Sequence, residues 1–187
     1  MTLRRLALSG SSLTSSWRAP VLAFLAGLLS ATALPPWSFP LGVFGFSLFF
    51  FLIYRTKTIK KGVLFVWIFG FGYHLFGLQW ISNALLIDSE QFAWLLPFSL
   101  IGIPALLAII PSLIMPILCK ILIPPFWFPI LAATLWTLSE YLRGHLFSGF
   151  PWNLPAYMLS FSDSIIQTAS IVGAYGLSWL LILFTAG

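Results

Sequence analysis

The chain has 187 residues, of which 60% are hydrophobic and 7% are charged, and its formal net charge is +5. Its mean hydropathy of +1.02 excludes an ordinary soluble domain and indicates an integral membrane protein. No segment shows the alternation of polar and apolar residues that a membrane β-strand needs. We therefore expect an all-α membrane fold, with no nucleic acid as a partner.

Six apolar runs follow a basic amino-terminal segment, residues 1–19, and predict six transmembrane helices. They cover approximately residues 20–34, 41–54, 62–85, 92–123, 128–142 and 164–187. The first run has an alternative interpretation as a signal peptide, because Ala31-Thr32-Ala33 has the small-x-small form of a cleavage site. We interpret it as an uncleaved span that ends at Pro35 and Pro36.

The basic residues predict the orientation of these helices. With a cytoplasmic amino terminus, eight of the nine lie inside: Arg4, Arg5, Arg18, Arg55, Lys57, Lys60, Lys61 and Lys120. Only Arg143 lies outside. Because short cytoplasmic loops are enriched in lysine and arginine, we expect a multi-pass protein of the bacterial inner (cytoplasmic) membrane, with both ends of the chain in the cytoplasm.

Two features of the third run point to packing and to a possible polar site. Gly70, Gly72 and Gly77 predict close approach of neighbouring helices, which small residues allow in membranes. His74 lies within the same run. An intramembrane histidine is a functional hypothesis, but no second histidine or carboxylate is nearby in sequence, so we favour a buried structural imidazole over a functional role.

The fourth run is too long for one upright helix. Pro97, Pro104 and Pro111 recur every seven residues, which predicts a single tilted and bent helix. Cys119 lies near its end with no base beside it. We interpret this cysteine as an inert packing thiol rather than a nucleophile.

The segment Glu140–Trp152, with the sequence E-Y-L-R-G-H-L-F-S-G-F-P-W, concentrates polar and charged residues between two apolar runs. Glu140 and Arg143 are three residues apart, so they share a helix face and can pair. Gly149 and Pro151 predict a loop after the helix. Irregular backbone at this depth must be buried in protein or line a wet cavity, which makes the loop the candidate site.

Two roles are open for this segment. The Glu140 and Arg143 pair can fasten the helix end, or Arg143 can hold a lipid phosphate at headgroup level, since guanidinium suits bidentate phosphate contact. Phe150 and Trp152 can border acyl chains or serve as interfacial anchors. The sequence has no phosphate loop, zinc-protease motif or nucleophile elbow. We expect no catalytic residue, cofactor or metal site in this chain.

The same segment, together with Leu154–Tyr157, resembles the E-x-L-R-G-x-x-x-x-G-F-P-W motif of bacterial apolipoprotein N-acyltransferases. Three further stretches are similar to the family's first, third and sixth spans. These are Leu25–Pro36 with A-L-P-P-W at its end, Gly70–Leu85 with G-x-x-W at Gly77–Trp80, and Val172–Leu181. The resemblance covers most of residues 20–187, in the family's order.

The resemblance implies a lipid-processing enzyme. These acyltransferases move an acyl chain from a phospholipid to an enzyme cysteine, and then to the amino-terminal diacylglyceryl-cysteine of an apolipoprotein. Their catalytic Glu, Lys and Cys lie in a nitrilase-like periplasmic domain after a seventh span. Nothing in this chain matches that domain. The resemblance therefore implies a membrane part truncated before the seventh span, which binds lipid but is inactive alone.

By this resemblance, the expected partners are a phospholipid acyl donor, an apolipoprotein acceptor and membrane lipid. The expected lipid-binding residues are Glu140, Arg143, Gly149, Phe150, Pro151, Trp152 and Trp80. Two other hypotheses remain. The bent, proline-rich spans also fit a small transporter or channel subunit. A non-catalytic remnant of a decayed gene has the same sequence features, so whether the chain is an enzyme stays open.

Overall fold

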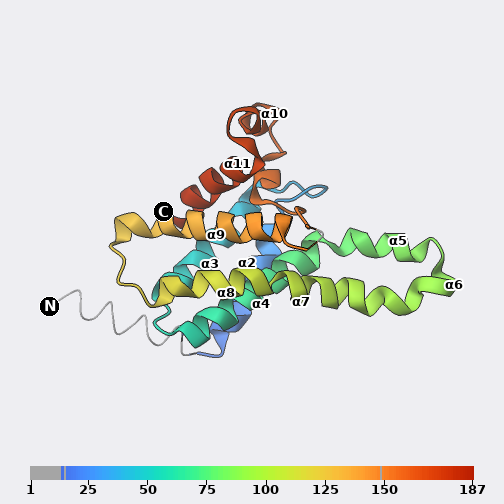
Figure 1. Ribbon diagram of the computed structural model, residues 1–187, viewed down its shortest axis with the longest axis horizontal. Helices are drawn as coiled ribbons and strands as arrows, with labels where there is room; N and C mark the ends of the chain where they lie inside the picture. Colours follow the sequence, from blue (N-terminus) through green and yellow to red (C-terminus); the bar gives the residue numbers. More distant parts are fainter. Residues whose placement is uncertain (1–13, 15, 148) are drawn as a thin grey trace.

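The computed structural model describes residue 14 and residues 16–147 and 149–187. Within this part the chain is helical and has no strand, which confirms the expected all-α class (Figure 1). Arg4 and Arg5, two of the residues that predict the orientation, lie outside the described residues. The α-helices are α2 (Arg18–Ala31), α3 (Phe44–Arg55), α4 (Ile59–Gly77), α5 (Ser82–Leu86), α6 (Ser89–Phe92), α7 (Ile103–Leu107), α8 (Ile109–Ile114), α9 (Phe128–His145), α10 (Asp163–Ile166) and α11 (Ala169–Ala186).

Three helical stretches of the described part are long and apolar enough to cross a membrane. They are Ile59–Gly77, Ser89–Cys119 and Ala169–Ala186. Two shorter apolar stretches, Arg18–Ala31 and Pro40–Arg55, fall below that length. Helix α9 has 18 residues but carries the buried Glu140 and Arg143 in its last turns.

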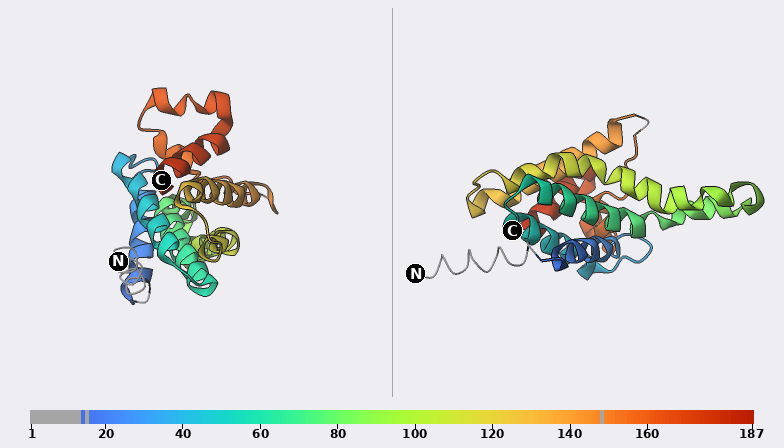
Figure 2. Two further views of the ribbon diagram at one scale, coloured as in Figure 1. Left: turned by 90° about the vertical axis from the view of Figure 1, so that its left-hand side faces the viewer. Right: turned by 90° about the horizontal axis from the view of Figure 1, so that it is seen from below.

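The stretch Ser89–Cys119 is one long irregular helix. A π-helical turn at Phe98–Gly102 follows Pro97, and a 3₁₀ turn at Met115–Cys119 ends the stretch. Proline removes a backbone donor and displaces the preceding turn, which explains why the α-helical segments between these turns are short. The beginning of the stretch pairs with α5 in a hairpin that extends beyond the other helices (Figure 2, right).

Small residues let α2 lie directly against α4. A side-chain carbon added at Gly72 of α4 would come within 2.7 Å of the Phe24 carbonyl oxygen of α2. At Gly27 of α2, such a carbon would overlap the Phe69 carbonyl of α4. The predicted close approach of helices at the glycines of the third run is thus confirmed at Gly72.

An aromatic cluster holds α3, α4 and α9 together. Phe49 of α3 stacks on Phe69 of α4 with ring centroids 4.0 Å apart, and Phe46 meets Trp136 of α9 edge-on at 5.0 Å. All four rings are buried. Trp136 lies one helical turn before Glu140, so this cluster fixes the place of the α9 carboxyl-terminal end, where the charged pair begins.

Candidate functional site

The loop after α9 folds back onto the end of that helix. The helix ends at His145, and Gly149 then takes a φ of +73°, a conformation that glycine adopts without steric cost. The Gly149 amide donates to the Leu146 carbonyl at 2.9 Å, and the Phe150 amide donates to the Arg143 carbonyl at 2.9 Å. These two bonds close the loop into a compact turn.

Arg143 ties this turn to the helix. Its side chain forms an ion pair with Glu140, and each of the two side chains is only 2% exposed. The guanidinium also donates to the carbonyl oxygens of Phe150, at 2.5 Å, and Trp152, at 2.8 Å. The pairing predicted from the three-residue spacing is confirmed. Because the group points inward to three acceptors, it positions the loop; contact with a lipid phosphate stays a prediction.

A second attachment joins the loop to α4. The Tyr73 hydroxyl donates to the Asn153 carbonyl at 2.7 Å, and both residues are buried. Asn153 has a φ of +57°, which asparagine tolerates better than most residues. Its side-chain amide lies against Gly77, where any side chain would overlap it. Sequence reasoning missed Tyr73 and Asn153, although an asparagine between Trp152 and a proline-containing turn is a signal for this backbone conformation.

A cavity of about 350 Å³ lies between the loop, the turn that follows α4 and the segment that follows α2. The indoles of Trp80 and Trp152 form one wall, with ring centroids 5.3 Å apart, and both are about half exposed. The complete lining consists of Leu34, Pro35, Trp80, Pro151, Trp152, Asn153 and Tyr157. A neighbouring cavity of about 320 Å³ shares Pro35 and Trp80 with it. The lining is mainly apolar and aromatic, which suits an acyl chain.

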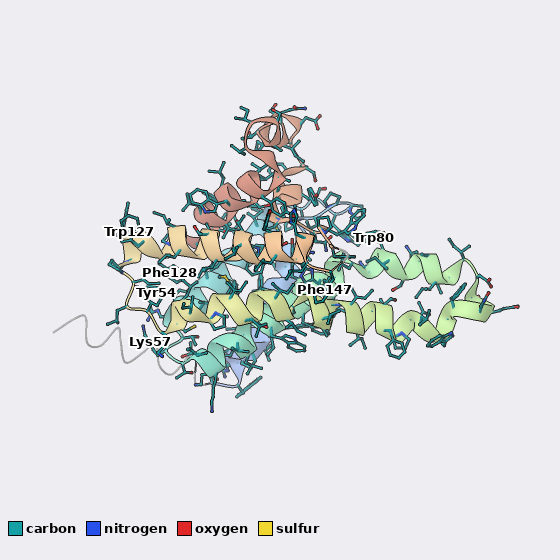
Figure 3. All side chains as sticks on the ribbon, in the orientation of Figure 1. Tyr54, Lys57, Trp80, Trp127, Phe128 and Phe147 are labelled. Carbon is teal, nitrogen blue, oxygen red and sulfur yellow. The ribbon has the colours of Figure 1, made fainter. Side chains whose placement is uncertain are left out.

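The seven expected site residues thus fall into two groups. Trp80, Pro151 and Trp152 line the cavity. The others, Glu140, Arg143, Gly149 and Phe150, shape the loop behind it. Phe147 at the tip of the loop was not among the expected residues. It is fully exposed and takes a φ of +56° (Figure 3).

The remaining polar candidates lie outside this cavity lining. His74 is buried, with its ring 5.2 Å from that of Tyr73, and its Nδ1 atom has no hydrogen-bond partner among the described residues. Cys119 is buried at the other end of the bundle, 3.9 Å from the Ile53 carbonyl. Among the described residues, no cluster of three or more histidine, cysteine or acidic side chains is placed to hold a metal ion.

Comparison with known proteins supplies a family for this arrangement. Residues 26–187 match the family model of the apolipoprotein N-acyltransferase N-terminal domain. An apolipoprotein N-acyltransferase of Rhodopseudomonas palustris is 38% identical over 181 residues, which cover 93% of this chain and 34% of that protein. Proteins of the same name from Brucella suis and Rickettsia typhi are 35% and 33% identical, over 91% and 89% of this chain.

The chain spans about a third of the length of the curated relatives it matches. The family match nevertheless covers the loop, the Trp80 and Trp152 cavity and the helices that support them. The chain therefore belongs to the apolipoprotein N-acyltransferase family, through its N-terminal domain.

Proposed function

We propose that this chain is the membrane part of an apolipoprotein N-acyltransferase, and that it brings a phospholipid acyl donor and an apolipoprotein acceptor to a separate catalytic domain. The observation that carries the proposal is the aromatic cavity of about 350 Å³ beside the loop. It combines an apolar lining with an open wall of two indoles, Trp80 and Trp152. Family membership favours this function over that of a transporter or channel subunit.

The physical chemistry of the substrates supports a site within the membrane. Each methylene of an acyl chain costs about 0.8 kcal/mol to expose to water, so a diacyl lipid does not leave the bilayer readily. A cavity beside membrane helices receives such a chain sideways. In this proposal Trp80, Pro151 and Trp152 contact the lipid and Phe150 borders it, while Glu140, Arg143 and Gly149 position the loop that carries them.

The proposal includes six spans, cytoplasmic chain ends and a periplasmic loop, in the inner membrane of a bacterium. It is supported by the basic residues near the starts of α2 and α4 and at the end of the long fourth helix, while Asp88 and Glu90 lie at the far hairpin. Cysteines introduced in place of Phe147 and Lys60 test the orientation. A maleimide that cannot cross the inner membrane should label the cysteine at position 147 from the periplasm. It should label the cysteine at position 60 only after the inner membrane is permeabilised.

Catalysis is assigned to the nitrilase-like domain that the family resemblance implies, and not to the residues of this chain. We expect the purified 187-residue chain to transfer no acyl group from phospholipid to a diacylglyceryl lipopeptide. Mass spectrometry of the lipopeptide measures this directly. A product that gains one acyl chain in the presence of the purified chain would refute the division of labour.

Lipid binding is tested by photocrosslinking. p-Benzoylphenylalanine in place of Trp152 should crosslink to radiolabelled phospholipid in detergent micelles, with a yield that saturates and that excess unlabelled phospholipid suppresses. The same replacement at Trp94 is the control, because Trp94 is 67% exposed, compared with 51% for Trp152, and lies outside the cavity lining. We expect the control yield to rise linearly without saturation. Identical behaviour at both positions would reject the cavity as a lipid site.

A further inference from the structure

A second pair of cavities lies at the basic end of the bundle, far from the Trp80 and Trp152 cavity. Figure 3 places Tyr54, Lys57 and Phe128 together at this end and Trp80 at the other. The larger cavity, of about 490 Å³, lies between α3, the start of α9 and the end of α11. Its lining is mostly apolar and includes Phe44, Phe51, Pro129 and Phe184. It is wide and apolar enough for an acyl chain.

The smaller cavity, of about 290 Å³, has a different lining. Thr56 and Lys57 contribute from the turn after α3, and Cys119 and Lys120 from the end of the long fourth helix. Both lysines are exposed. Among the described residues that line the two cavities, none is acidic. The smaller cavity therefore presents uncompensated positive charge.

Two aromatic residues join the cavities. Tyr54 and Phe128 line both of them, and their rings meet edge-on with centroids 5.0 Å apart. The Lys57 ammonium group lies 5.9 Å from the centre of the Tyr54 ring. An apolar groove thus opens, across one aromatic pair, into a cationic cavity. This arrangement matches a lipid whose acyl chain lies in the apolar groove and whose negative headgroup lies in the cationic cavity.

We propose that this pair of cavities is a binding site for an anionic phospholipid, with its phosphate between Lys57 and Lys120 and an acyl chain in the groove beside Phe44 and Phe51. Basic pockets between membrane helices have the chemistry that recognises acidic headgroups. The site is separate from the cavity assigned to the acyl donor. Its placement in the cytoplasmic leaflet rests on the orientation given under Proposed function.

Lipid titration of the purified chain followed by native mass spectrometry tests the proposal. The probes are phosphatidylglycerol and phosphatidylethanolamine with identical acyl chains. The chain should prefer phosphatidylglycerol. Because each lysine near a lipid surface contributes roughly fivefold, the double variant Lys57→Ala with Lys120→Ala should lower this preference by about 25-fold. The matched control, Lys60→Ala with Lys61→Ala, removes the same charge outside both cavities and should keep most of the preference.

A second variant tests the apolar half of the site. Ser47 lines the larger cavity, and Ser47→Trp fills part of it without removing a charge. We expect weaker binding of phosphatidylglycerol, with unchanged saturable crosslinking at position 152. Equal losses in the two lysine double variants, or no loss in either, would overturn the proposal. If the chain that carries only the replacement at position 152 shows no saturable crosslinking, the acyl-donor cavity is rejected and the anionic-lipid site is unaffected. The two proposals therefore fail separately.

Discussion

The two ends of this bundle use charged side chains in opposite ways. At the loop end, Glu140 and Arg143 are almost completely buried and bond to each other and to the loop backbone. At the basic end, Lys57 and Lys120 are exposed beside a cavity. A buried charge must be satisfied by the protein itself, so it fixes geometry; an exposed charge remains available to a ligand. In our proposals, burial therefore separates the residues that position the loop from the residues that bind lipid.

The largest effect is expected when the buried guanidinium is removed. Arg143→Ala leaves the Glu140 carboxylate unpaired and two backbone carbonyls without a donor, so we expect a loss of roughly 3–5 kcal/mol of stability. Thermal unfolding of the purified chain in detergent measures the loss. Arg18→Ala is the control, since Arg18 is exposed at the start of α2 and should change little.

A compensating double variant shows whether the cost comes from the unpaired charge. Glu140→Gln with Arg143→Met removes both charges and retains side-chain volume. Because an uncompensated buried charge is the expensive state, the double variant should be more stable than Arg143→Ala. A double variant that unfolds as early as the single one would instead assign the main cost to the lost bonds with Phe150 and Trp152.

The loop backbone is the next target. Gly149 has a φ of +73°, which an alanine rarely adopts, and the methyl group of Gly149→Ala would overlap the Gly144 carbonyl. We expect a loss of about 1–3 kcal/mol, measured by thermal unfolding, and weaker saturable crosslinking at position 152. Gly102→Ala is the matched control, because the nearest atom to a methyl group there is 3.9 Å away. Equal effects of both substitutions would contradict the assigned role of the turn.

Local patterns in the sequence predicted the parts of this structure that depend on neighbouring residues. Composition and apolar runs predicted the helical class, and a three-residue spacing predicted the pairing of Glu140 with Arg143. Gly149 and Pro151 predicted the turn. Each of these features is decided within one or two helical turns of chain, where periodicity and backbone preference act directly.

Contacts between distant segments were beyond the reach of those patterns. The bond from Tyr73 to Asn153 joins residues 80 positions apart. The cavity wall combines Trp80 with Trp152, two residues that the family resemblance grouped in one site and that local periodicity did not connect. The cationic cavity combines Lys57 with Lys120 in the same way. Such pairs depend on how helices pack, which periodicity within one run does not specify. The sequence therefore predicted the loop but not its attachment to α4.

A smaller effect is expected at that attachment. Tyr73→Phe removes the hydroxyl that donates to the Asn153 carbonyl and keeps the ring in the aromatic core, so the loss should be about 1 kcal/mol. Hydrogen exchange should then increase in residues 149–154 and stay unchanged in α2. Faster exchange throughout the chain would mean that Tyr73 supports the core rather than the loop.

The smallest effect on stability is expected at the basic end, and it distinguishes recognition from positioning most sharply. Lys57→Ala with Lys120→Ala should shift the melting temperature in lipid-free detergent by less than about 2 °C, because both side chains are exposed. Phosphatidylglycerol should stabilise the wild-type chain, since a ligand that binds only the folded state raises its stability. Phosphatidylglycerol should stabilise the double variant much less than the wild-type chain. A large decrease in the melting temperature without lipid would mean that these lysines stabilise the fold, as Arg143 does, and do not form a binding site.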